Sequence, residues 1–227
     1  MSRPVLILRP APGAGRTAVK ARGAGLEPVV APLFHVRPLA WSAPDPAAFD
    51  ALLLTSANAA RHGGAALALY RRLPAYAVGA ATAREAAMAG WERVITGSGD
   101  SGAVIARAVS DGRRRLLHLA GREHIAAEDK GAVVERRIVY ASEAVDSLPP
   151  QAIEALAADA VVLIHSARAG ALLRSLLDAA GIVVDRIAIA AISTVALAAA
   201  GEGWRERAAA ESPDDTALLA VAARLCD

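Results

Sequence analysis

The sequence lacks several features that would point to particular classes of protein. Its 227 residues include one cysteine, Cys226, which excludes an internal disulfide framework and paired-cysteine metal or redox motifs. A net charge of +2, from mostly scattered basic residues, indicates no nucleic-acid partner. The longest charge-free segment, 187–201, is shorter than the ~20 residues of a membrane-spanning helix, and the N-terminal apolar run is too short for a secretory signal. We therefore expect a soluble, cytoplasmic protein that does not bind membranes.

Aromatic residues are also scarce, at 4%, although 55% of the residues are hydrophobic. Alanine is the largest part of that hydrophobic fraction, so the core must be built from small aliphatic side chains on closely packed helices. At this length the chain can form one large domain or two small ones.

A repeated stretch favours two domains. Residues 50–61 and 159–170 each contain four apolar residues, a turn with a serine, and an alanine-rich segment with helical spacing. This pattern predicts a buried parallel strand, a sharp turn and a helix N-terminus. The hydroxyls of Ser56 and Ser166 can cap these helices, and the remaining backbone N–H groups suit a carboxylate or phosphate.

After each copy of the repeat, similar strand-like and helix-like segments follow in the same order. This order predicts two α/β domains with doubly wound parallel sheets. Boundary-type composition near residues 36 and 141 suggests that the chain ends meet in one domain and that the middle forms the other. The extended runs 33–37 and 133–140 can pair as a two-stranded connector. A linear split near residue 112 is the alternative.

A possible dinucleotide fingerprint lies at residues 13–18, which fit the pattern G-x-G-x-x-A. The fingerprint needs its first glycine at a strand end and an acidic residue closing the next strand. Here residues 9–12 separate the glycine from the predicted strand, and residues 29–32 contain no acidic side chain. These departures favour a solvent-facing glycine loop followed by a helix over 15–24.

Small and polar residues recur where the predicted strands end, and ligands of open α/β sheets bind at such carboxyl ends. The candidates are Thr55, Ser56, Asn58, Gly79, Thr82, Gly121, Arg122, Tyr140, His165, Ser166, Arg168, Ser193 and Thr194. The five histidines show no metal-ligand spacing, and no Ser-His-Asp order or phosphate-binding loop is present. The alternative is that Ser56, Ser166, Asp100 and Asp214 are only helix caps.

Five motifs in this order resemble those of the uroporphyrinogen-III synthase family. They are Thr-Ser-Ala-Asn-Ala at 55–59, Val-Gly-Ala-Ala-Thr-Ala at 78–83, Leu-Ala-Gly-Arg at 119–122, Val-Tyr at 139–140 and Ala-Glu-Ser-Pro at 210–213. The resemblance implies two doubly wound domains joined by a two-stranded antiparallel connector. It favours the discontinuous division, with residues 1–36 plus 142–227 in one domain and 37–141 in the other.

The resemblance also implies an activity. The linear tetrapyrrole hydroxymethylbilane would lose its hydroxyl as water, ring D would be inverted through a spiro intermediate, and uroporphyrinogen III would form without a cofactor or metal. Substrate binding is implied for Thr55, Ser56, Thr82 and Ser166, and a role near the leaving hydroxyl for Tyr140. The segments 164–166 and 193–196 depart from the family pattern, which weakens the inference for the second repeat.

Two other functions remain open from the sequence. A non-catalytic binding protein for a polyanionic small molecule would use the same turns, and a dinucleotide-binding oxidoreductase would use residues 13–18. For the synthase we expect a monomer that contacts the preceding pathway enzyme transiently.

Overall fold

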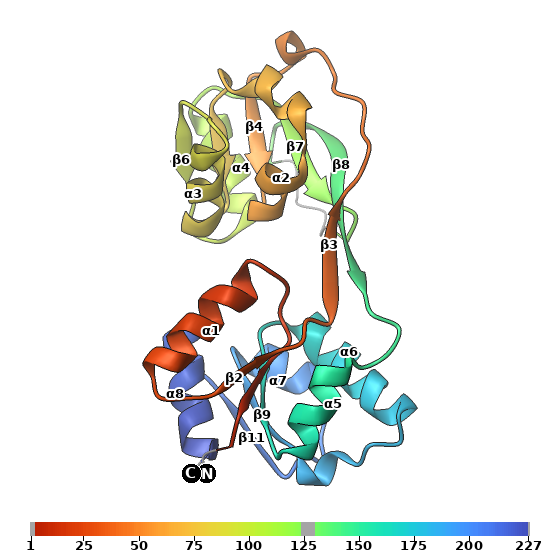
Figure 1. Ribbon diagram of the computed structural model, residues 1–227. Helices are drawn as coiled ribbons and strands as arrows, with labels where there is room; N and C mark the ends of the chain where they lie inside the picture. Colours follow the sequence, from red (N-terminus) through yellow and green to blue (C-terminus); the bar gives the residue numbers. More distant parts are fainter. Residues whose placement is uncertain (1–2, 124–129, 227) are drawn as a thin grey trace. The chain divides into compact units, whose positions relative to one another are not determined.

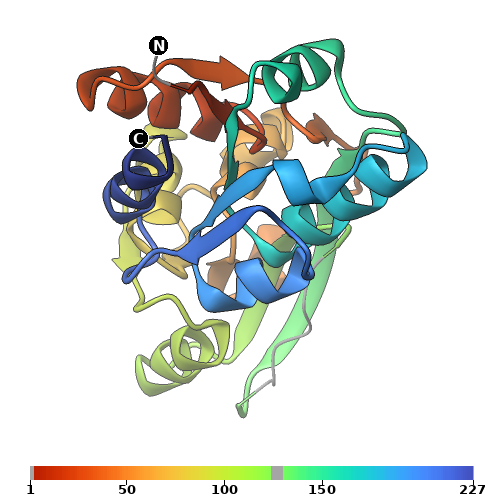
Figure 2. The same cartoon turned by 90° about the horizontal axis from the view of Figure 1, so that it is seen from below.

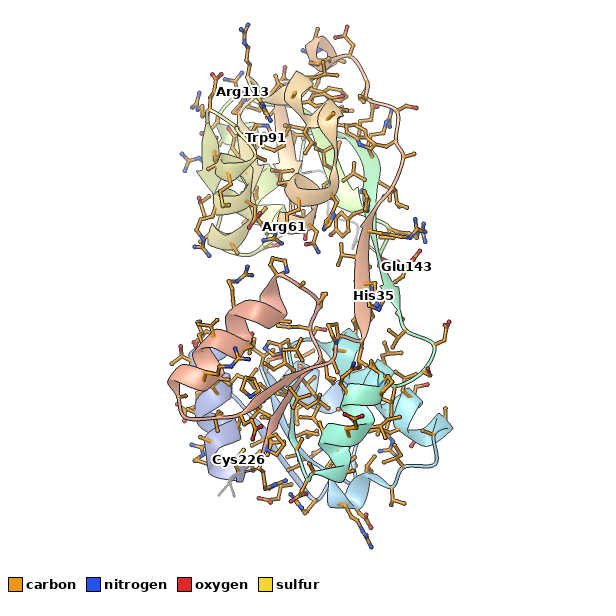
Figure 3. All side chains as sticks on the ribbon, viewed as in Figure 1. His35, Arg61, Trp91, Arg113, Glu143 and Cys226 are labelled. Atoms are coloured by element: carbon orange, nitrogen blue, oxygen red, sulfur yellow. The ribbon has the colours of Figure 1, made fainter. Side chains whose placement is uncertain are left out.

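The computed structural model describes residues 3–123 and 130–226 and divides the chain into two compact units. Unit 1 combines Met1–His35 with Glu143–Asp227, and unit 2 is Val36–Ser142. His35 and Glu143, both labelled in Figure 3, are the residues of unit 1 at which the chain passes to and from unit 2. Each unit has its own sheet and its own core.

The sheet of unit 1 has five strands in the order β11-β10-β9-β1-β2, and its neighbouring strands pair in parallel. The strands are β1 (Val5–Ile7), β2 (Pro28–Val30), β9 (Val161–Ile164), β10 (Ala188–Ala191) and β11 (Glu206–Ala209). The strands β1, β9 and β10 are buried along their whole length, because helices cover both faces of the sheet. Their continuous apolar runs follow from this double burial.

Helices cover the two faces of this sheet in two groups (Figures 1 and 2). One face holds α1 (Gly13–Gly23) and α8 (Asp215–Cys226), and the other holds α5 (Pro150–Ala157), α6 (Ala167–Ala179) and α7 (Thr194–Ala199), with a 3-10 turn η3 (Val184–Arg186). A Cβ added to Gly170 of α6 would lie 2.9 Å from the carbonyl oxygen of Ala196 on α7. The small residues thus allow the close helix packing that the alanine content predicts.

The sheet of unit 2 has the order β3-β8-β7-β4-β5-β6. Its strands are β3 (Phe34–Pro38), β4 (Ala51–Leu54), β5 (Ala75–Ala77), β6 (Val94–Thr96), β7 (Arg115–Gly121) and β8 (Val133–Ala144). From β8 to β6 every neighbouring pair is parallel. The order reverses at β4, because the chain moves outward to β5 and β6 on one side and then returns to β7 and β8 on the other.

Helices again cover both faces, which gives the doubly wound arrangement expected from the repeat. One face packs against α2 (Ala57–His62), α3 (Ala80–Met88) and the 3-10 turn η2 (Ala65–Tyr70), and the other against α4 (Ser101–Ser110). A short turn, η1 (Pro46–Ala48), precedes β4. The Tyr70 hydroxyl donates to the carbonyl oxygen of Pro44 at 2.7 Å, which ties this loop to the core.

The expected pairing of residues 33–37 with 133–140 falls on β3 and β8, which are hydrogen-bonded neighbours. The Val145 N–H donates to the Leu33 oxygen at 3.0 Å, and the Leu39 N–H donates to the Val139 oxygen at 2.9 Å. Residue numbers rise along one strand as they fall along the other, which is the antiparallel sense. That these strands act as the connector of two independent domains stays a prediction.

The expectation for residues 13–18 is wrong. These residues form the first turns of α1, which begins at Gly13 rather than at residue 15. Gly13 is buried beneath the Arg9 side chain, and a Cβ there would lie 2.5 Å from Arg9 Nε. Gly13 therefore packs inside unit 1 as part of α1, and the solvent-facing loop is not present.

Candidate functional site

A pocket of about 310 Å³ opens at the carboxyl end of the sheet in unit 2. Its lining residues are Thr55, Ser56, Val78, Gly99, Ser101, Gly121, Glu123 and Tyr140. They follow β4, β5 and β7, end β7, lie within β8 in the case of Tyr140, or lie at the start of α4. The strand order reverses at β4, between β5 and β7, and ligands of open α/β sheets bind at such a switch point.

The turn after β4 supplies two hydroxyls to this pocket. Ser56 caps α2, and its Oγ accepts a hydrogen bond from the Asn58 N–H at 3.2 Å. Thr55 Oγ1 lies 2.9 Å from Nε2 of His118 on β7. The cap predicted for Ser56 is therefore confirmed, and it leaves the hydroxyl proton available for a second partner.

The position of Tyr140 depends on an irregularity in β8. Ala120 of β7 pairs with Ile138, whereas the next residue, Gly121, pairs with Tyr140, so Val139 is an extra residue in the ladder. Such a bulge changes the side of the sheet to which the following side chain points. It places the Tyr140 ring directly over Gly121, where an added Cβ would lie 2.6 Å from Cζ of the ring.

The Tyr140 ring packs on the core of unit 2 that contains Leu119 and Val139. The sequence also allows the Tyr140 ring to pack against Leu33 or Phe34, but these two residues belong to the core of unit 1. Burial raises the pKa of the Tyr140 phenol, a hydrogen bond with Ser56 lowers it in part, and Glu123 raises it again. The phenol is therefore protonated at neutral pH and can donate its proton.

The N-terminus of α4 forms another wall of the pocket. Asp100 caps this helix, and its carboxylate accepts from the N–H groups of Gly102 and Ala103 at 3.0 and 3.2 Å. Gly99 has a φ of +107°, a conformation that side chains disfavour, and it brings the turn against the pocket. Ser101 adds a third hydroxyl next to those of Thr55 and Ser56. In the sequence Asp100 is a candidate helix cap, whereas Gly99 and Ser101 are not among the predicted site residues. The motif Ser-Gly-Asp-Ser at 98–101 is the signal for this helix start.

Four predicted residues of unit 2 do not line this pocket. Asn58 accepts a hydrogen bond from Arg61 at 3.1 Å, and Gly79 is the extended residue before α3. Thr82 is 6% exposed within the first turn of α3. Arg122 donates its backbone N–H to the Tyr140 oxygen at 3.0 Å, so it supports the bulge through its main chain.

In unit 1 the predicted serines are helix caps. Ser166 Oγ accepts from the Ala169 N–H and Ser193 Oγ from the Ala196 N–H, both at 3.2 Å. Thr194 is the first residue of α7. The cap that the sequence predicts for Ser166 is confirmed, and Ser193 is a further cap. A contact of Ser166, Ser193 or Thr194 with a ligand stays a prediction.

A polar cluster lies where β1 and β9 end. Asp215 accepts from Arg9 at 3.1 Å and from Thr17 at 3.2 Å, and its Oδ1 lies 3.4 Å from Nε2 of His165. The His165 contact is long, and no well-aligned hydrogen bond joins the two side chains. The contact with His165, followed by the charge of Arg9 and the hydroxyl of Thr17, outweighs burial and lowers the pKa of Asp215 to about 2.

The described residues contain neither a metal-ligand cluster nor a membrane-spanning helix. Residues 3–123 and 130–226 contain no group of three or more His, Cys, Asp or Glu side chains that could hold a metal ion. Within the same part of the chain, no helix is both long and apolar enough to cross a membrane. His124, one of the five histidines, lies outside the described residues.

Comparison with known proteins identifies relatives over most of the chain. A family model described as uroporphyrinogen-III synthase HemD matches residues 15–220. The crystal structure of uroporphyrinogen-III synthetase from Helicobacter pylori 26695 matches with a TM-score of 0.70 and 17% identity, over 98% of this chain and 99% of that one.

A mutant uroporphyrinogen III synthase from the extremely thermophilic bacterium Thermus thermophilus gives a TM-score of 0.51 at 17% identity, over 96% of this chain and 97% of that one. No curated protein sequence matches the chain significantly. At these identities the two structures show a shared fold, which confirms the predicted α/β class.

Proposed function

Because the chain belongs to the uroporphyrinogen-III synthase family, we propose that its unit 2 pocket binds the reacting part of hydroxymethylbilane during cyclisation to uroporphyrinogen III. Family membership confirms the resemblance found in the sequence motifs and makes the chain an enzyme of tetrapyrrole synthesis. It does not favour a dinucleotide-binding oxidoreductase.

The observation that carries this proposal is the protonated phenol of Tyr140 beside the hydroxyls of Thr55, Ser56 and Ser101. In the proposed step the pyrrole nitrogen of the terminal ring supplies an electron pair as the bond between the methylene carbon and the hydroxyl oxygen breaks. Tyr140 donates a proton to that oxygen, so that it leaves as water. Glu123, which raises the pKa of the phenol, keeps the proton available.

The other polar groups of the pocket suit the acetate and propionate groups of the substrate. A carboxylate accepts hydrogen bonds only, and serine and threonine hydroxyls can donate to it. The volume of about 310 Å³ is at the lower end of small-molecule sites, which span roughly 300–1,000 Å³. Unit 2 therefore holds only part of the tetrapyrrole in this pocket, and we assign further carboxylate contacts to Ser166, Ser193 and Thr194.

Several finer assignments belong to the same proposal. The reaction removes water and closes a ring, so the enzyme is a hydro-lyase. It needs no cofactor, works as a monomer in the cytoplasm, and contacts the preceding pathway enzyme only transiently. Asn58, Gly79, Thr82 and Arg122 stay proposed substrate contacts outside the pocket, through side chains or backbone N–H groups.

The test is to incubate the purified protein with hydroxymethylbilane and to separate the product isomers. Uncatalysed closure gives the type I isomer, so the proposal predicts the type III isomer in amounts that depend on the protein. If only type I forms while the bilane binds tightly, the chain is a non-catalytic binding protein for a polyanion. If neither occurs, the proposed function is wrong.

A further inference from the structure

His118 of β7 is a buried polar side chain that the proposed reaction does not use directly. It is 1% exposed and lies on the sheet face that packs against α4, among Leu53, Leu116 and other apolar residues. In the sheet register His118 is beside Leu53 of β4 and beside Arg136 of β8. A polar ring at such a position needs hydrogen-bond partners.

Two hydrogen bonds fix which ring nitrogen carries the proton. Arg136 donates from Nε to Nδ1 of His118 at 3.3 Å. A guanidinium in a protein stays protonated and only donates, so Nδ1 must present its lone pair. The proton of the neutral imidazole then belongs to Nε2, and Nε2 donates to Thr55 Oγ1 over the distance of 2.9 Å.

The direction of the hydrogen bond from His118 to Thr55 determines what the Thr55 hydroxyl offers to the pocket. Thr55 Oγ1 accepts from His118, so its own hydroxyl proton is directed to another acceptor. Thr55 lines the pocket, and the neighbouring Ser56 hydroxyl likewise accepts from a backbone N–H group. The Thr55 hydroxyl therefore offers its proton to whatever occupies this part of the pocket, whereas the Ser56 hydroxyl is hydrogen-bonded to Tyr140.

We propose that His118, held by Arg136, is a positioning residue that directs the Thr55 hydroxyl proton to a substrate carboxylate. The inference rests on the proposed function and adds a specificity device to it. A carboxylate oxygen takes the Thr55 proton, and His118 does not compete for it because Nε2 already carries its own proton. The chain of donors runs from Arg136 through His118 and Thr55 to the ligand.

A spectroscopic test examines the donor chain without substrate. In protein labelled with ¹⁵N at its five histidines, two-bond ¹H–¹⁵N spectra distinguish the two tautomers, and His118→Gln identifies the signal of His118. We expect Nε2 to be protonated and Nδ1 unprotonated at neutral pH. In Arg136→Met this preference should weaken, because the donor to Nδ1 is gone. Protonation of Nδ1 in the wild-type protein would overturn the proposal, whatever the activity of the chain.

A kinetic test separates positioning from structural support. His118→Leu removes the donor to Thr55, and KM for hydroxymethylbilane should rise about 3–10-fold, the usual effect of one hydrogen bond, with little change in kcat. His118→Gln, whose amide N–H can replace Nε2, should restore most of the affinity. In a Thr55→Val background, His118→Leu should have no further effect on KM.

Two results would contradict the role of His118. One is an unchanged KM in a folded His118→Leu protein, and the other is an equal rise in KM with and without the Thr55 hydroxyl. If His118→Leu does not fold, Arg136→Met gives the same comparison at a partly exposed position. If the wild-type protein does not cyclise the bilane, the proposed function fails, and the tautomer measurement still decides the donor chain.

Discussion

The Tyr140 phenol is the residue on which the proposed chemistry depends most. Tyr140→Phe keeps the ring over Gly121 and removes only the hydroxyl, so the protein should fold normally. A positioned general acid contributes about 10²–10⁴-fold, and an electron-rich pyrrole expels hydroxide readily, so we expect kcat to fall by about 10–100-fold. Steady-state kinetics with isomer separation measures this loss. Full turnover with full type III selectivity would assign the proton donor to another group.

Asp215 makes the stability of unit 1 sensitive to acid. Its folded-state pKa, about 2, lies below the ordinary value of 3.8, so its contribution is complete above pH 4 and is lost as the pH falls toward 2. Solvent screens part of these interactions, so the ionised Asp215 contributes about 1–2 kcal/mol to the free energy of unfolding. Asp215→Asn should lower the free energy of unfolding by about this amount at pH 7, with a smaller difference at pH 3. Denaturant titrations at both pH values measure it.

The matched control for Asp215→Asn is the variant Asp178→Asn. Asp178 forms an ion pair with Arg174 one helical turn away, and its side chain is 57% exposed. Exposed pairs of this kind contribute little, so the control should change stability by less than about 0.5 kcal/mol at either pH. Equal losses in the two variants would show that the cluster around Asp215 has no special role.

At the scale of elements, the bulge at Val139 positions Tyr140 opposite Gly121. Gly121→Ala would place a methyl group against the outer atoms of the Tyr140 ring. These atoms can move, so stability should change by less than about 1 kcal/mol, whereas kcat should fall because the phenol is displaced. Thermal unfolding and kinetics test both parts. Gly23→Ala, where an added Cβ meets nothing within 4 Å, is the control, and equal activity in the two variants would contradict the positioning role.

The elements show what the sequence could predict. The repeated strand, turn and helix could be predicted, because four apolar residues followed by a capping serine have few other folded arrangements. The orientation of Tyr140 could not be predicted, because simple alternation along β8 places it on the face of Arg136 and Ile138, and a bulge has no fixed sequence pattern. The start of α1 at Gly13 lies two residues before the predicted start, an offset that no residue pattern indicated.

The candidate site was predictable to a similar degree. Thr55, Ser56, Gly121 and Tyr140 meet in one pocket because parallel strands end at one edge of the sheet. Gly99 and Ser101 come from a helix start that looked like a cap alone. His118 gave no signal, since its importance arises from its neighbours across β4 and β8.

At the scale of the whole molecule, unit 2 is a continuous segment with a parallel sheet covered on both faces. We expect residues 36–142, produced alone, to fold with a cooperative thermal transition, because both cores of that sheet are drawn from this segment. Near-UV circular dichroism and hydrogen exchange test this. A broad transition with no protected amides would show that unit 2 is not an independent domain.

The central claim is that the whole chain directs cyclisation to the type III isomer. Spontaneous closure to type I proceeds at a rate independent of the protein, so the two products report a competition. The most direct measurement is the type III fraction of the product at increasing protein concentration and fixed hydroxymethylbilane. The account predicts that this fraction rises until type III dominates. A product that stays type I at every protein concentration would contradict it.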